Sequence, residues 1–230
     1  MVALVNVLAI ETATTTCAIG LRLSTGEEVE VILDDERHHT ETLMPGVADL
    51  LASSELRVKQ LDRIVVDRGP GLYTGLRVGV ATAIGLSIGA NADLVSVTSL
   101  EVLARDAHRG GVRGVLVAAL DGRRGELFIQ RFSLGDTVVA VDEPSVTTPA
   151  ALAAWVEARG ELVNLAGDGV RRYEAELSTV APATLLLDYA TPSALVAVEL
   201  GASRVPEESV APMYLRDADA VANFTTRERQ

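Results

Sequence analysis

Two halves of the chain repeat one pattern of strands and turns. In the first half a strand-like run ends at Glu11, and the turn at 24–26 closes the next hairpin about a dozen residues later. In the second half a strand ends at Asp121, and the turn at 133–135 follows at nearly the same offset. Ordinary β-meanders also look alike, but an acidic residue closing the first strand of each half is more specific. If a duplicated fold binds a nucleotide in its cleft, these two acidic turns face each other across it.

The order of the elements is that of a mixed α/β protein. Strand-like runs rich in β-branched residues cover 5–10, 17–23, 29–33, 63–66, 94–97, 126–132, 138–141 and 161–166. Helical patterns cover 40–53, 74–89, 149–159 and 191–203. We therefore expect a first subdomain over residues 1–104, a second over 105–205, and a partly disordered tail over 206–230.

Composition excludes several classes of protein. Lys and Arg total 20 against 32 Asp and Glu, and the net charge of −12 disfavours tight, direct binding of nucleic acid. Cys17 is the only cysteine, which excludes an internal disulfide and a cysteine-built zinc site and indicates a reducing compartment. The longest uncharged apolar stretch, 78–92, is too short to span a bilayer. We expect a soluble cytoplasmic protein without a membrane partner.

The residues that could carry chemistry are few. Glu11, Thr12 and the threonines that follow could hold magnesium and a phosphate, although the turn lacks a second glycine and could be an ordinary polar turn. Adjacent His38 and His39 point apart, so we expect no metal site. Cys17 lies inside a strand pattern and is expected to be a small core residue. We expect no catalytic residue.

The segment 69–79 is the most distinctive stretch of the chain. Its Gly-Pro-Gly loop opens a helix with Thr74 as candidate N-cap, and such a helix start suits an anion. The Lys-Ser/Thr pair of a phosphate-binding P-loop is missing. Gly75, Gly79 and Ala83 lie four apart, so that face allows another helix to approach closely, and we favour packing over phosphate binding.

A charged hairpin turn follows in the second half. Asp121, Arg123, Arg124 and Glu126 gather there within six residues. The turn either binds a partner or is a solvated turn of mutually paired side chains.

Six segments together resemble the TsaB (YeaZ) family. They are spread in order over almost the whole chain, at 8–13, 39–45, 69–79, 121–128, 167–169 and 212–216. The resemblance implies an actin/hexokinase/Hsp70-like (ASKHA) fold with two similar α/β subdomains about a cleft. It also implies a role in making N6-threonylcarbamoyladenosine (t6A) at position 37 of tRNAs that read codons beginning with A.

The resemblance further implies that the protein is not an enzyme. In that family TsaB is a scaffold for TsaD, which transfers the threonylcarbamoyl group, and the ATPase TsaE completes the complex. The protein would have no cofactor of its own, because ATP and magnesium are used through the partner subunits. It would meet tRNA only indirectly and form a homodimer when alone. The family's contact surface corresponds here to His39, Leu43, Val47, Leu50, Thr74, Gly75, Arg77, Gly79 and Ala83.

The chain departs from the family pattern at informative places. Glu11 replaces the usual aspartate, Leu72-Tyr73 replaces a Ser-Phe pair, and Gly122 replaces a usual alanine. Any nucleotide site built from Glu11, Thr12 and Asp121 is therefore expected to be vestigial. Two alternatives stay open: an ASKHA-fold ATPase or small-molecule kinase that uses Glu11 and Asp121 across the cleft, and a glycoprotease-like peptidase.

Overall fold

The first of two mixed sheets is formed by the N-terminal part of the chain. The computed structural model describes residues 5–33 and 39–216. The strands follow the order β3-β2-β1-β4-β5, with β1 antiparallel to β2 and parallel to β4. Their bounds are Val7–Glu11 (β1), Cys17–Arg22 (β2), Glu28–Leu33 (β3), Arg63–Asp67 (β4) and Asp93–Val97 (β5).

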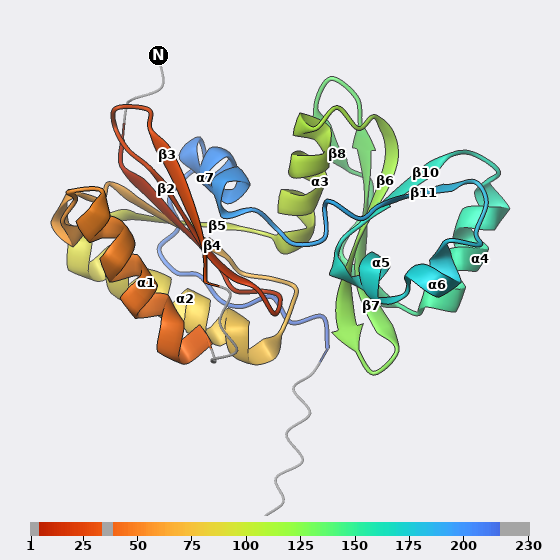
Figure 1. The fold of residues 1–230 in the computed structure, drawn as a ribbon, viewed down its shortest axis with the longest axis horizontal. Coiled ribbons are helices and arrows are strands. Elements are labelled where there is room, and N and C mark those ends of the chain that lie inside the picture. The colour runs from red at the N-terminus through yellow and green to blue at the C-terminus, as the bar shows by residue number, and fades with distance from the viewer. Residues whose placement is uncertain (1–4, 34–38, 217–230) are drawn as a thin grey trace, which may run out of the picture.

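Helices cover both faces of this sheet. Helices α1 (His39–Ser53) and α2 (Tyr73–Ala90), with the short 3-10 helix η1 (Val58–Gln60) near them, lie on one face. Helix α7 (Ala194–Ala202) lies on the other (Figure 1). The side chains of β1 alternate accordingly, since Leu8 and Ile10 pack toward α1 and α2 while Val7 and Ala9 pack toward α7. Burial on both faces explains why the strand reads as a continuous apolar run. Cys17 is buried in the α1/α2 side of this core, as expected.

The second sheet repeats the topology of the first. Its order is β11-β10-β6-β7-β8, and β9 pairs with β7. The bounds are Gly114–Arg123 (β6), Glu126–Leu134 (β7), Val138–Ala140 (β8), Ser145–Thr147 (β9), Val163–Ala166 (β10) and Ala183–Leu186 (β11). Strand β6 occupies the place of β1 and β10 that of β4. The predicted duplication of an α/β unit is confirmed.

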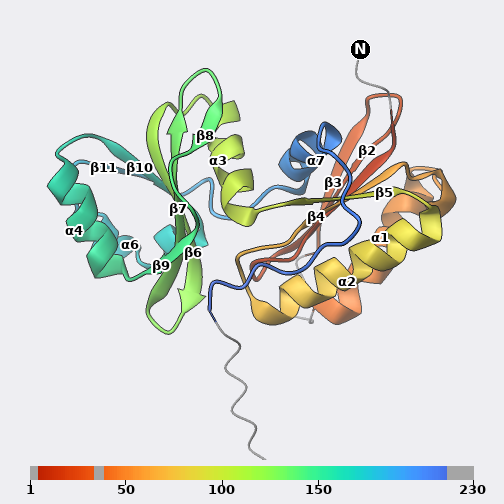
Figure 2. The ribbon, with the colours of Figure 1, turned by 180° about the vertical axis from the view of Figure 1, so that it is seen from behind.

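The helices around the second sheet also divide between its faces (Figure 2). Helix α3 (Ser99–Arg109) covers the face nearer the first sheet. The other face is covered by α4 (Pro149–Arg159), α5 (Asp168–Arg172) and α6 (Glu174–Leu177). None of the described helices is long and apolar enough to cross a membrane.

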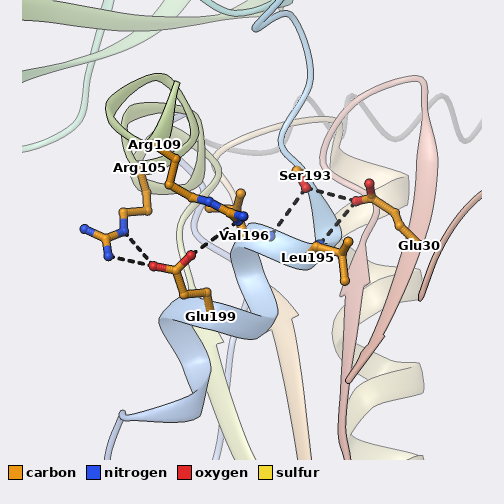
Figure 3. Close-up of polar contacts among 7 residues, drawn as sticks. All are labelled: Glu30, Arg105, Arg109, Ser193, Leu195, Val196 and Glu199. Carbon is orange, nitrogen blue, oxygen red and sulfur yellow. Dashed lines mark hydrogen bonds and ion pairs between the residues drawn. The ribbon is translucent and has the colours of Figure 1, made fainter. Parts of the chain in front are cut away.

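Two helices differ from the expected division of the chain. The boundary expected after residue 104 lies inside α3, and α7, expected in the second subdomain, packs on β1 and β2 instead. Figure 3 shows how α7 is held. At its start, the Glu30 carboxylate of β3 accepts hydrogen bonds from Ser193 Oγ at 3.0 Å and the Leu195 N–H at 3.2 Å. Further along, the Glu199 carboxylate pairs with Arg105 at 2.6 Å and Arg109 at 3.3 Å, both on α3.

Residues 206–216 belong to the folded part of the molecule. The Glu207 N–H donates to Leu94 O at 2.8 Å, and the Met213 N–H donates to Arg68 O at 2.7 Å. The segment then reaches the second sheet, where Arg216 pairs with Glu126 at 2.7 Å. The rest of the expected disordered tail, 217–230, lies outside the described residues.

Candidate functional site

Each sheet carries a pair of acidic residues where its two central parallel strands end. In the first sheet Ile10 pairs with Val66, so the next residues, Glu11 and Asp67, lie side by side. In the second sheet Asp121 lies in β6 beyond the part that pairs with β10, and its N–H donates to Asp168 Oδ1 of α5 at 2.8 Å. The internal repeat therefore extends to pairs of acidic side chains.

The Glu11–Asp67 pair is buried. Glu11 Oε1 accepts the Ala13 N–H at 2.8 Å, and Asp67 Oδ1 accepts the Gly69 N–H at 2.7 Å and Ser99 Oγ at 2.9 Å. Burial, and then the Asp67 carboxylate, raise the pKa of Glu11 well above its usual range. Burial also raises the pKa of Asp67, against hydrogen bonds from Glu11, Ser99 and the Gly69 N–H that lower it.

A proton on Glu11 would give a hydrogen-bond partner to the two oxygen atoms of this pair that lack one. Glu11 Oε2 and Asp67 Oδ2 are buried and have no other partner among the described residues. A protonated Glu11 that donates to Asp67 satisfies both oxygen atoms. The pair then carries one negative charge instead of two.

The Gly-Pro-Gly loop packs on the turn that follows Glu11 and forms hydrogen bonds with it. The Leu72 N–H donates to Ala13 O at 2.7 Å, and Thr12 Oγ1 donates to Gly75 O at 2.9 Å. A Cβ on Gly71 would lie 2.2 Å from Ala13 O, so only glycine allows the loop to lie this close. Thr12 is fully buried. A magnesium nucleotide, which the fold family implies, does not fit Glu11 and Thr12, because both side chains are buried and the turn is covered by its own chain.

Asp121, the third residue of the expected nucleotide site, is used within its own subdomain. Its carboxylate accepts the Arg123 N–H at 2.9 Å and forms ion pairs with Arg123 at 3.0 Å and Arg172 at 3.5 Å. Burial raises the pKa of the neighbouring Asp168. The two turns that hold Glu11, Thr12 and Asp121 thus follow the corresponding central strands of the two sheets. The side chains of Glu11 and Thr12 are buried.

Most residues of the expected partner surface lie in the core. Six of the nine are buried between their helix and the first sheet in the single chain: Leu43, Val47, Leu50, Gly75, Gly79 and Ala83. A Cβ on Gly79 would lie 2.2 Å from Thr12 Oγ1, so the small residues bring α2 close to β1 and its turn. Thr74 and Arg77 are exposed, and the His39 side chain lies outside the described part of the chain.

The opposite side of the two helices is exposed and largely apolar. We call it the α1/α2 face, formed by Met44, Ala48 and Ala52 of α1 and Ala81, Gly85 and Ile88 of α2. Helices α1 and α2 run side by side along the first sheet in both views (Figures 1 and 2). Ile88 is 77% exposed, and a Cβ on Gly85 would meet open space.

Sequence reasoning missed Asp67, which completes the buried acid pair, and Ser99, which donates a hydrogen bond to Asp67. A signal for Asp67 was present, since it directly follows a predicted strand that runs parallel to the first one. Cys17 behaves as expected, because burial raises the pKa of its thiol to about 11 and suppresses the nucleophilic thiolate.

Comparisons with known proteins found a matching family model and several related sequences. The TsaD family model, described as tRNA N6-adenosine threonylcarbamoyltransferase, matches residues 33–223. The tRNA threonylcarbamoyladenosine biosynthesis protein TsaB of Haemophilus influenzae is 33% identical over 126 residues, which are 55% of this chain and 53% of that protein. An uncharacterized protein of Mycobacterium tuberculosis is 32% identical over 94% of this chain and 93% of its own length.

A solved structure matches a larger share of the chain than the Haemophilus influenzae TsaB does. YeaZ from Pseudomonas aeruginosa superimposes with a TM-score of 0.77 and 27% identity, over 92% of this chain and 100% of that one. The chain spans about half the length of the first curated TsaB relatives that it matches.

Proposed function

Because the chain belongs to the TsaD family by its family model and to the TsaB (YeaZ) family by its relatives, we propose that it acts in t6A biosynthesis. Its role is that of a non-catalytic scaffold in the cytoplasm. It binds and activates TsaD, with TsaE, for threonylcarbamoyl transfer to adenosine 37 of tRNAs that read codons beginning with A.

The α1/α2 face is the observation that carries this proposal. Glycine in an exposed helix costs about 1 kcal/mol relative to alanine, and Gly85 needs no space for a neighbour within its own chain. Ile88 stands exposed one turn away. Small residues beside an exposed, large apolar side chain allow a helix of a partner protein to pack closely on this face. When the chain is alone, a second copy pairs through the same face.

The closed acidic turn supports a non-catalytic role. Neither Glu11 nor Thr12 offers an oxygen atom to a metal at the surface of the molecule. ATP and magnesium are then used through the partner subunits, and the protein needs no cofactor of its own. The same geometry argues against the ATPase and kinase alternatives, which require Glu11 to be open.

The test begins with light scattering on a sizing column. The full chain is mixed with the TsaD of the same organism, and a defined complex is expected to replace the separate species. Addition of TsaE, tRNA, ATP and the threonylcarbamoyl precursors is then expected to yield t6A only when the chain is present. Separate elution together with t6A formation in its absence would overturn the proposal. Calorimetry with Mg-ATP on the chain alone tests the ATPase alternative, for which millimolar nucleotide should produce heat.

A further inference from the structure

Six arginines lie along one end of the molecule, although the chain as a whole is acidic. We call this set the arginine edge: Arg77, Arg123, Arg124, Arg171, Arg172 and Arg216. The start of α2, the β6–β7 hairpin and the end of the described chain all lie there in both views (Figures 1 and 2). Arg172 of α5 joins them through its 3.5 Å ion pair with Asp121. These six are a large share of the 20 basic residues in a chain with net charge −12.

The hairpin turn presents two of these arginines in an unfavourable backbone conformation. Arg123 pairs with Glu126 across the hairpin, which leaves Arg124 and Gly125 as the two-residue loop. Arg123 has φ of 62° and Arg124 has φ of 56°. Residues with a Cβ rarely adopt these values, and glycine, asparagine and aspartate are the residues that such turns prefer. Arginine at both positions indicates that the side chains serve a purpose other than forming the turn.

Neighbouring groups hold this turn in place without covering its charges. The Arg123 N–H donates to Asp121 Oδ1, and Arg216 donates to Gly122 O at 2.6 Å. The Arg123 side chain remains 44% exposed and that of Arg172 53% exposed. Asp121 pairs with both Arg123 and Arg172, and Glu126 pairs with Arg216.

A pair of exposed aromatic rings lies at the same end. The centroids of Tyr73 and Tyr214 are 4.9 Å apart, and the rings are tilted by 31°. The Arg77 guanidinium lies 4.0 Å from the Tyr73 ring centroid, and its Nε donates to Tyr214 Oη at 3.0 Å. The two tyrosines are 38% and 41% exposed. Tyr214 lies two residues before Arg216, so the rings and the hairpin turn are neighbours.

We propose that the arginine edge and the Tyr73–Tyr214 pair bind structured RNA directly, through its phosphate backbone and an unpaired base. The choice of RNA rests on the proposed function. Guanidinium groups match phosphate oxygens with two parallel hydrogen bonds, and a row of them along an edge suits an extended polyanion. Exposed tyrosine rings and a stacked arginine plane suit an unstacked base. The chain then contributes to tRNA binding itself, in contrast to the indirect contact expected from its net charge.

The test compares two matched double variants. Fluorescence anisotropy follows a labelled, unmodified tRNA transcript titrated with the full chain, alone and mixed with TsaD, between about 50 and 200 mM salt. Arg123→Asn with Arg124→Asn removes two charges and places a residue suited to positive φ in the turn, so the fold is kept. Arg57→Asn with Lys59→Asn removes two exposed charges from the η1 region and is the control.

We expect the hairpin variant to bind the transcript about tenfold more weakly at low salt. Its slope of log affinity against log salt should fall by about 2, one for each lost phosphate contact. Tyr214→Ala should weaken binding with little change in slope. Equal affinities and slopes for the hairpin and control variants would overturn the inference, as would wild-type protein that binds no transcript in either form.

Two further outcomes separate this inference from the proposed function. If the hairpin variant loses TsaD but binds RNA as wild type does, the edge binds an acidic protein segment and the RNA inference is wrong. If wild-type complex makes t6A while the hairpin variant binds RNA normally, the proposed function stands and only the RNA inference fails. If wild type does not bind TsaD at all, the proposed function fails, and titration of the chain alone still decides the RNA inference.

Discussion

Glu11 and Asp67, at the ends of two adjacent parallel strands, form a buried acid pair in which burial and the Asp67 carboxylate raise the pKa of Glu11. The pair also binds the Gly-Pro-Gly loop and α3, because Asp67 accepts the Gly69 N–H and Ser99 Oγ. The residue that closes the first strand is thus a structural acid in this protein. In an open turn the same position would present a carboxylate to a metal ion.

We predict that the free energy of unfolding falls as the pH rises above the usual carboxyl range. The raised pKa of Glu11 means that the folded protein keeps a proton that the unfolded chain has already lost. The stabilisation is fully present below the unfolded pKa and disappears as the pH passes through the folded one. The slope reaches at most about 1.4 kcal/mol per pH unit for one proton. Urea unfolding at a series of pH values measures it.

Glu11→Gln provides the decisive variant for this pH dependence. The amide donates permanently to Asp67, so the slope should flatten and the variant should exceed wild type in stability at high pH. Glu157→Gln, at an exposed position of α4, is the control and should leave the slope unchanged. A Glu11→Gln protein with the wild-type slope would show that another group keeps the proton.

Alanine at two glycines of α2 should change stability in opposite directions. Gly79→Ala places a Cβ 2.2 Å from the buried Thr12 Oγ1 and should destabilise the fold by about 1–3 kcal/mol. Gly85→Ala places its Cβ in open space and should stabilise the helix by about 0.5–1 kcal/mol. Thermal unfolding of the two variants measures the difference. Equal effects at the two positions would contradict the assigned orientation of α2.

Most of the strands, but not β9 and β11, could be predicted from the sequence, because the central strands of both sheets are buried on both faces. Runs of β-branched residues such as those of β1 and β4 mark buried strands wherever they occur. Helix α3 was not among the predicted helices, and the subdomain boundary expected after residue 104 falls within it. A signal was present, since Thr98 followed three residues later by Glu101 is a helix start, and the Thr98 side chain accepts the Glu101 N–H.

The orientation of α2 could not be predicted in the same way. Both faces of this helix consist of small and apolar residues, so periodicity does not show which one meets the sheet. The face of Gly79 is inside because it packs on Thr12 and Ile10, more than 60 residues earlier in the chain. Burial of Glu11 likewise depends on the loop that covers it, which no local pattern reveals.

We predict that Ile88→Glu abolishes docking of TsaD and self-pairing without unfolding the protein. The side chain is 77% exposed, so the substitution leaves the core intact while placing a charge on the apolar α1/α2 face. Leu162→Glu is the matched control, because Leu162 is also an exposed large apolar residue and lies in the second subdomain. Light scattering with TsaD and circular dichroism measure docking and folding. Normal docking by Ile88→Glu would move the contact away from the α1/α2 face.

Removal of the Arg63 side chain should lower the free energy of unfolding, because this side chain of β4 caps the C-terminal end of helix α7. Its Nη1 donates to three carbonyl oxygens at the end of that helix, Gly201 at 2.9 Å, Ala202 at 2.7 Å and Arg204 at 3.0 Å. A cation at this position also opposes the negative end of the helix dipole. Arg63→Ala should therefore lower the free energy of unfolding by about 2–4 kcal/mol and increase hydrogen exchange in α7.

Arg113→Ala serves as the comparison for Arg63→Ala. Arg113 also donates to two carbonyl oxygens, those of His108 and Val112, but these lie within five residues of it and the side chain is exposed. Its loss should cost about 0.5 kcal/mol or less, because water replaces the lost bonds. Arg63→Lys should fall between wild type and Arg63→Ala, since a single ammonium group cannot reach Asp93 and all three carbonyls together. Equal losses for Arg63→Ala and Arg113→Ala, with α7 exchange unchanged, would mean that apolar packing alone holds α7 on the first sheet.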